Sequence, residues 1–195
     1  MNSLDSSTKD FKPENQIWNV PNVLSLIRLS LALVVGLLIE WQYYLLAALL
    51  FLLAASTDFV DGWWARKYGQ VTKLGRVLDP FVDKIIVTAA LIALVGEQGS
   101  GISAWMVTVI VGRELLVTSL RAMVEGKGGD FSARWLGKWK MVLQCAAIVS
   151  SLLLLTYGAT QTWIGPTTLA LVWIAVLITI ASGVDYVVKA VRLSF

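Results

Sequence analysis

The sequence contains no histidine and only one cysteine, Cys145. Without histidine there is no imidazole to act as a general base or a metal ligand, and a Ser-His-Asp triad is excluded. A single cysteine permits no disulfide within the chain. Acid–base and metal chemistry must therefore rest on carboxylates, and Asp and Glu together number 13.

Charged residues are also scarce, at 15% of the chain, whereas 57% of the 195 residues are hydrophobic. This composition predicts an all-α polytopic membrane protein. Residues 1–17 are polar and predict a flexible cytosolic tail, and residues 18–195 predict one transmembrane domain. The first apolar run is long enough to remain as an anchor, so we expect no cleaved signal peptide. Six segments of about 20 residues each are predicted to span the bilayer: 22–40, 43–66, 79–96, 103–125, 133–157 and 165–191.

The distribution of basic residues predicts the orientation of these spans. All 16 Lys and Arg fall on the side of the two termini and of the connections 66–79 and 125–133, or near the span ends that face it. The other side has Glu40 and Glu97 and no basic residue. Because basic residues mark the cytoplasmic side, both termini and the connection at 66–79 are predicted to be cytosolic. The expected location is the inner cell membrane.

Two pairs of aspartates lie within residues 58–84, each beside an apolar run. Asp58 and Asp61 are three residues apart, and Asp79 and Asp83 are four apart. On a helix either spacing puts both carboxylates on one face. Four converging carboxylates would repel each other without cations, and oxygen ligands alone favour two Mg²⁺ or Mn²⁺ ions. Asp83 lies deepest in its span, which makes it the candidate general base.

These aspartates belong to a longer pattern, Asp-x₂-Asp-Gly-x₂-Ala-Arg, then eight residues, then Gly-x₃-Asp-x₃-Asp. The pattern resembles the signature of the CDP-alcohol phosphotransferases. The resemblance implies a site for two divalent cations and a segment that binds the CDP moiety. Its CDP-binding positions in this chain are Gly62, Ala65, Arg66 and Gly75.

A second group of charges lies near the cytosolic ends of the fourth and fifth spans. Arg113 and Arg121 stand within an otherwise apolar stretch, so we expect them to face the protein interior or a wet cavity. With Lys138 they are the candidates to bind an acceptor that carries a phosphate. Glu114 is expected to pair with one of the arginines. Membrane orientation explains the remaining basic residues of this region: Lys127, Arg134 and, less clearly, Lys140.

Three further segments, NVPNVLSLIR, GRELLVTSLR and WLGKWKMVLQ, narrow the resemblance to the bacterial phosphatidylglycerophosphate synthases of that family. This resemblance implies transfer of the phosphatidyl group from CDP-diacylglycerol to sn-glycerol 3-phosphate, with release of CMP, by a homodimer. The expected surroundings are the lipid bilayer, and no nucleic acid is expected as a partner. Inositol phosphate, serine or phosphatidylglycerol remain alternative acceptors. A cation channel or carrier is the alternative from another class, although the chain shows neither midplane charges nor inverted repeats.

Overall fold

The computed structural model describes residues 20–68, 73–126 and 135–194, which form six α-helices and no strand. Side chains are described for residues 26–56, 84–124 and 139–192. The prediction of an all-α fold with six helices is confirmed. The helices are α1 (Val20–Glu40), α2 (Tyr44–Tyr68), α3 (Lys73–Gly96), α4 (Ala104–Gly126), α5 (Trp135–Tyr157) and α6 (Ile164–Ser194).

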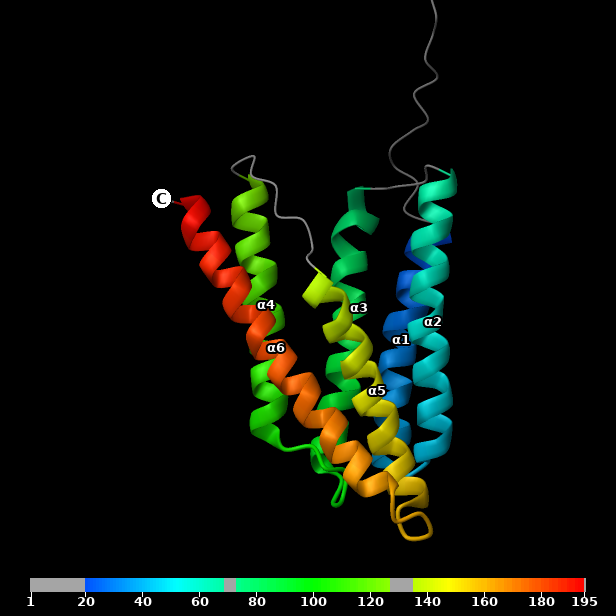
Figure 1. The fold of residues 1–195 in the computed structure, drawn as a ribbon. Coiled ribbons are helices and arrows are strands. Elements are labelled where there is room, and N and C mark those ends of the chain that lie inside the picture. Colours follow the sequence, from blue (N-terminus) through cyan, green and yellow to red (C-terminus); the bar gives the residue numbers. More distant parts are fainter. Residues whose placement is uncertain (1–19, 69–72, 127–134, 195) are drawn as a thin grey trace, which may run out of the picture.

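Successive helices run in opposite directions, so the bundle has two distinct ends (Figure 1). One end carries the start of α1, the end of α6, and the helix termini that flank residues 69–72 and 127–134. We call this the site end. The other, which we call the turn end, consists of the connections 41–43, 97–103 and 158–163.

The helices are long enough to cross a bilayer. The shortest, α1, has 21 residues, which at 1.5 Å per residue spans roughly 30 Å, the thickness of the hydrocarbon core. Within the described residues, Trp139–Tyr157 and Ile164–Arg192 are both long and apolar enough to be membrane spans. Tyr44–Ser56 and Lys84–Gly96 are shorter apolar helical stretches. These segments indicate a membrane protein, and the crossing of the membrane by all six helices remains a prediction.

Bulky apolar side chains face outward from every helix, each of them more than half exposed. Soluble monomers rarely expose extended apolar surface, whereas a bilayer favours it. The outward surface of the bundle is therefore chemically suited to lipid. One such side chain from each helix, in chain order, is Leu33, Leu49, Ile92, Leu115, Val142 and Leu177.

The third helix begins earlier than its apolar stretch suggests. The predicted span starts at residue 79, whereas α3 starts at Lys73 and includes Gly75, Asp79 and Pro80. Apolar residues mark the part of a helix suited to the bilayer, and a helix can continue beyond it through polar turns. Pro80 has no N–H, so the helix gives up one backbone hydrogen bond there. The connection between α2 and α3 is residues 69–72, which is shorter than the predicted connection 66–79.

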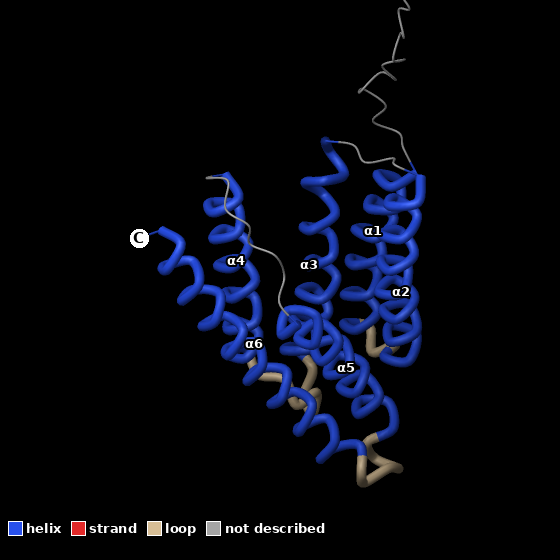
Figure 2. The backbone as a smooth tube through the Cα atoms, turned by 45° about the horizontal axis from the view of Figure 1, so that its top comes forward, coloured by secondary structure: helices blue, strands red, loops and turns tan. Residues whose placement is uncertain are grey.

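The buried apolar side chains form two clusters. The larger one includes Ile39, Phe51, Leu94 and Ile148, all fully buried, and draws on all six helices. The smaller one lies between α4 and α6 at the site end, and its buried members are Val117, Val124, Tyr186 and Ala190. In two views α4 and α6 run side by side, apart from α1, α2 and α3 at this end (Figures 1 and 2).

Polar side chains join α5 to its neighbours within the bundle. Gln144 donates a hydrogen bond to Thr179 of α6 at 3.0 Å, and the hydroxyls of Ser150 and Thr168 lie 2.6 Å apart. Ser151 donates to the backbone oxygen of Ser100 at 2.7 Å. Hydrogen bonds of this kind hold helices together where apolar burial alone cannot, as between helices surrounded by lipid.

Candidate functional site

Both aspartate pairs lie on helical backbone at the site end. Asp58 and Asp61 belong to the last turns of α2, and Asp79 and Asp83 belong to the first half of α3. The spacings of three and four therefore put each pair on one face of its own helix. Helices α2 and α3 contact each other, and only residues 69–72 separate them along the chain. The four side chains lie outside those that the structure describes, so their convergence on metal ions remains a prediction.

The predicted CDP-binding residues continue the same two helices. Gly62, Ala65 and Arg66 follow Asp61 within α2, and Gly75 lies in the first turn of α3. Three glycine or alanine positions beside a basic residue leave the backbone open to close approach by a ligand. Their side chains are also outside the described set, and their role in binding CDP remains a prediction.

The chemistry of the donor set fits divalent cations. Four carboxylates supply oxygen ligands alone, which suits Mg²⁺ or Mn²⁺ better than Zn²⁺ or Cu²⁺. Among the side chains that the structure does describe, no three Asp, Glu or Cys lie close enough together to hold a metal ion. The aspartates of α2 and α3 are thus the candidate metal ligands of this chain.

A buried ionic cluster joins the middle of α4 to the first third of α5. Arg113 donates a hydrogen bond from Nη1 to Oε1 of Glu114 at 3.0 Å, and Nζ of Lys140 donates to the same oxygen. Arg113 is 9% exposed and Lys140 is 6% exposed. Charged side chains are rarely buried so deeply unless they are paired. The expected pairing of Glu114 with one of the two arginines of this segment is confirmed for Arg113.

Helix α6 covers the other side of Arg113. The ring of Tyr186 lies under the guanidinium, with its centroid 5.3 Å from Cζ. Gly183 packs against the stem of Arg113, since a Cβ at this position would come within 3.0 Å of Cγ. Two guanidinium nitrogens of Arg113, Nε and Nη2, are buried without a hydrogen-bond partner among the described residues.

The structure describes less of the other two residues that were predicted to bind the acceptor phosphate. Arg121 lies two turns beyond Arg113 on α4; it is half-buried, and its Nε has no hydrogen-bond partner in the described part of the chain. Lys138 lies in the first turn of α5, but its side chain is outside the described residues. Lys127 and Arg134, assigned to membrane orientation, are also outside them.

Lys84 connects this cluster to the aspartate segment. It follows Asp83 directly in α3 and donates a hydrogen bond to Oγ1 of Thr118 on α4. The same hydroxyl donates to the backbone oxygen of Glu114 at 2.6 Å. The segment of α3 that carries Asp83 therefore lies beside the part of α4 that carries Arg113.

Lys140 is the residue that the sequence assignment missed. Its grouping with the membrane-orienting lysines is wrong, because its side chain is buried and bound to Glu114. A signal was present in the sequence: Lys140 and Gln144 are polar residues four apart within the largely apolar segment of α5. Two polar residues at that spacing within an apolar helix share a face directed at protein rather than lipid.

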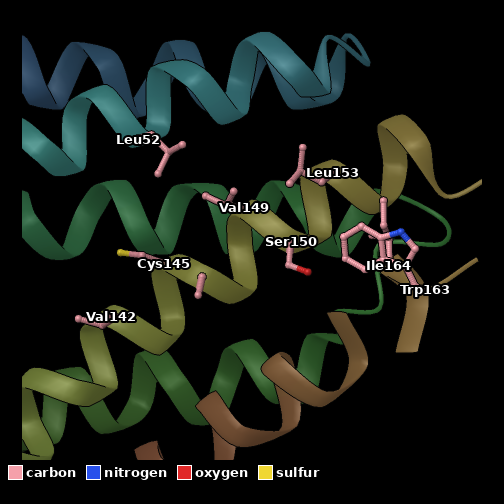
Figure 3. Close-up of a pocket in the computed structure, with 9 residues that line it drawn as sticks. Leu52, Val142, Cys145, Val149, Ser150, Leu153, Trp163 and Ile164 are labelled. Atoms are coloured by element: carbon pink, nitrogen blue, oxygen red, sulfur yellow. The ribbon is translucent and has the colours of Figure 1, made fainter. Parts of the chain in front are cut away.

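An apolar groove of about 440 Å³ lies elsewhere on the bundle, between α2, α5 and the start of α6 (Figure 3). Leu52, Val149 and Leu153 line it, and Trp163 lies toward the turn end. Its one hydroxyl, on Ser150, is already bonded to Thr168. The groove offers no charged group for a phosphate and does not include the ionic cluster.

Comparisons with a family model and with individual relatives agree on one protein family. Residues 18–181 match the model of the CDP-alcohol phosphatidyltransferase family. A relative from Bacillus subtilis (strain 168) is 39% identical, with 89% of this chain and 95% of the relative covered. Relatives from Cereibacter sphaeroides and Escherichia coli (strain K12) are 33% and 32% identical, over 89% of this chain and 96% and 95% of their own lengths.

All three relatives carry the same name, CDP-diacylglycerol–glycerol-3-phosphate 3-phosphatidyltransferase. The match spans the aspartates of α2 and α3 and the ionic cluster of α4 and α5 alike. The chain belongs to the CDP-alcohol phosphatidyltransferase family.

Proposed function

We propose that this protein transfers the phosphatidyl group of CDP-diacylglycerol to sn-glycerol 3-phosphate, giving phosphatidylglycerophosphate and CMP. The names of the relatives support the two substrates. The observation that carries the choice of a phosphorylated acceptor is the buried Arg113, which keeps two donors without a partner among the described residues. An acceptor without a charge would give such a buried cation little to bind.

The proposed setting is the inner cell membrane, crossed six times, with both termini and the site end on the cytoplasmic side. The outward apolar surface of the helices supports this placement, as does the absence of basic residues from the turn-end connections. CDP-diacylglycerol would then reach the site from the cytoplasmic leaflet, and glycerol 3-phosphate would arrive from the cytosol. A homodimer, implied by the family resemblance, is part of the same proposal.

In the proposed reaction Asp83 is the general base. The acceptor hydroxyl oxygen attacks the lipid-side phosphorus of CDP-diacylglycerol, and its proton passes to the Asp83 carboxylate. A bond forms between that oxygen and the phosphorus, while the bond from phosphorus to the CMP oxygen breaks. CMP leaves with the bonding electron pair. The transfer needs no covalent enzyme intermediate, which agrees with a chain that has no histidine to activate a nucleophile.

The carboxylates of Asp58, Asp61, Asp79 and Asp83 would hold two Mg²⁺ or Mn²⁺ ions. Ions bound by these carboxylates would supply positive charge to the diphosphate of the substrate and to the leaving phosphate. This role explains why four carboxylates lie on two neighbouring helices, where they would otherwise repel each other.

Substrate binding is divided between the two regions of the site end. Gly62, Ala65, Arg66 and Gly75 are proposed to bind the CDP moiety, with Arg66 donating to the diphosphate. The acceptor phosphate is assigned to Arg113, Arg121 and Lys138. Charge-assisted hydrogen bonds to phosphate are about twice as strong as neutral ones, and burial strengthens them further.

The proposal is tested by measuring CMP release from the purified protein in lipid nanodiscs with CDP-diacylglycerol and Mg²⁺. The acceptors compared are sn-glycerol 3-phosphate, glycerol, inositol phosphate, serine and phosphatidylglycerol. We expect glycerol 3-phosphate to give the fastest release, and glycerol to give little. Faster release with inositol phosphate, serine or phosphatidylglycerol would assign the same chemistry to another acceptor. No release with any of them would reject the transferase.

A further inference from the structure

Three contacts fix the orientation of the Arg113 guanidinium. Glu114 accepts a hydrogen bond from Nη1, the Tyr186 ring supports one face of the plane, and Gly183 packs against the stem. Tyr186 is itself 2% exposed, so the ring is held by its own surroundings. An arginine side chain has many rotamers, and three contacts from two helices select one of them.

The contacts leave a specific part of the guanidinium unused. Nε and Nη2 lie on one edge of the plane, and this pair of parallel N–H groups matches two oxygens of a phosphate. In Arg113 these two nitrogens are the ones without a hydrogen-bond partner among the described residues, whereas Nη1 is bound to Glu114. Glu114 therefore holds the arginine from one side and leaves its two-donor edge for an oxyanion.

Glu114 also controls the charge of the cluster. Its Oε1 accepts from both Arg113 and Lys140, so one carboxylate separates two buried cations that come from different helices. Without that carboxylate the two cations would repel each other strongly, because like charges interact more strongly away from water. The cluster of three groups keeps a net charge of one positive unit, which still attracts a phosphate.

From these contacts we infer that Glu114 is a positioning residue for the acceptor phosphate, acting through Arg113. Lys140 fixes the Glu114 carboxylate from α5, and Tyr186 fixes the guanidinium from α6. The inference rests on the proposed role of Arg113 in binding glycerol 3-phosphate. It adds two residues, Glu114 and Lys140, that need not touch the substrate. Both Nε and Nη2 are covered in this structure, so an acceptor reaches them only when neighbouring side chains move aside.

The test is steady-state kinetics of the full-length protein in nanodiscs, with both Michaelis constants measured for Glu114→Gln and Glu114→Asp. Glutamine removes the charge at nearly constant shape, and aspartate keeps the charge but shortens the reach. For Glu114→Gln we expect the KM for glycerol 3-phosphate to rise about tenfold and the KM for CDP-diacylglycerol to change less than about twofold. Glu114→Asp should fall between wild type and Glu114→Gln. Glu97→Gln makes the same chemical change at the turn end and should alter neither constant.

A double-mutant cycle separates positioning from a general structural effect. If Glu114 acts through Arg113, Glu114→Gln should add little to the KM change already produced by Arg113→Ala, so the two effects are far from additive. Additive effects, an equal rise in both Michaelis constants, or a lower KM for glycerol 3-phosphate would overturn the inference. A lower KM would mean that the carboxylate competes with the phosphate.

The same measurements distinguish the failure of this inference from the failure of the proposed function. If Arg113→Ala leaves the KM for glycerol 3-phosphate unchanged, Arg113 does not bind the acceptor and the inference falls with that assignment. If Arg113→Ala raises this KM but both Glu114 variants leave it unchanged, the role of Arg113 in binding the acceptor is supported. Only the positioning role of Glu114 is then rejected. Should Glu114→Gln fail to fold, Glu114→Asp and its cycle with Arg113→Ala decide the question.

Discussion

Polar groups at the turn end of the bundle have hydrogen-bond partners, whereas some buried donors of α4 have none among the described residues. At the turn end Tyr44 donates a hydrogen bond to Glu97 at 2.6 Å, which ties the start of α2 to the end of α3. Backbone hydrogen bonds close the connection after α1, including Tyr43 N to Leu38 O at 2.8 Å. In contrast, Arg113 in the middle of α4 keeps Nε and Nη2 buried without a partner among the described residues, and Arg121, two turns nearer the site end, keeps Nε.

The proposed function explains this contrast as a difference between groups that maintain the fold and groups that bind a ligand. A buried donor without a partner costs about 1–3 kcal/mol, so a protein that needed only stability would not gain from keeping three of them. At the turn end, by comparison, the hydroxyl of Tyr44 and the backbone N–H of Tyr43 both have hydrogen-bond partners. The donors of Arg113 and Arg121 that lack a partner among the described residues are the ones that the proposed function assigns to a substrate anion.

Removal of the metal-binding carboxylates should have the largest effect. We expect Asp58→Asn, Asp61→Asn and Asp79→Asn each to abolish turnover, because an amide cannot replace a carboxylate as counter-charge to a divalent ion. EDTA should abolish the activity of the wild type, and Mg²⁺ or Mn²⁺ should restore it. The readouts are CMP release and the elution profile in size-exclusion chromatography, which checks folding. Near-normal turnover of any two variants would reject the two-metal site.

Substitution of Asp83 should differ from substitution of the other three aspartates, because it should leave the binding of CDP-diacylglycerol intact. If Asp83 is the base, Asp83→Asn loses the chemical step but binds CDP-diacylglycerol within about tenfold of wild type, or 1.4 kcal/mol. Binding is measured directly by isothermal titration with Mg²⁺ present. A collapse of binding together with turnover would make Asp83 chiefly a metal ligand.

Substitutions of the acceptor site should have smaller effects that fall on one substrate. Arg113→Ala, Arg121→Ala and Lys138→Ala each remove a charge-assisted contact of about 1.5–3 kcal/mol. We expect the KM for glycerol 3-phosphate to rise by roughly one to two decades and the KM for CDP-diacylglycerol to stay nearly constant.

Lys127→Ala and Arg134→Ala are the controls for this series, because both residues are assigned to membrane orientation alone. Equal effects of the arginine variants on both Michaelis constants would contradict the assignment of the pocket. So would acceptance of glycerol as readily as its phosphate.

The smallest effect is expected at the turn end. Tyr44→Phe removes the hydroxyl that donates to Glu97 and should lower the free energy of unfolding by about 1 kcal/mol. Neither Michaelis constant should change, because this contact lies at the opposite end of the bundle. Thermal unfolding in nanodiscs and the same kinetic assay provide the two measurements. Loss of activity at unchanged stability would contradict the prediction that the Tyr44–Glu97 contact contributes to stability alone.

Prediction from sequence succeeded where the information is local. Each helix has its own apolar stretch, so α1 begins within two residues of the expected start and α5 ends at the expected residue, Tyr157. The aspartate pairs were recognised from their spacing within single helices. Helix α3 starts at Lys73, before the predicted span at 79, because polar residues continue the helix beyond its apolar part, and apolar content alone does not mark where a helix begins.

The ionic cluster could be predicted only in part. Glu114 and Arg113 are adjacent in sequence, and their pairing was expected from two charges in one apolar stretch. Lys140 is 26 residues away from Glu114, and no pattern within α4 indicates which residue of α5 will meet it. The contact of Arg113 with Tyr186 and Gly183 depends in the same way on how α6 packs against α4.

The sequence by itself determined the helical class, the number of helices, the family, and the position of the aspartates within α2 and α3. The helical class, the helix number and the aspartate positions depend on composition and on spacing within one helix, where the period of the helix sets which residues share a face. The family follows from the resemblance of the motif that extends from Asp58 to Asp83. Only the tertiary structure decided that Glu114 would bind Arg113 and Lys140 together, and which edge of the guanidinium would stay unused. Those features arise where α4, α5 and α6 meet, and contacts between helices depend on packing that no single segment encodes.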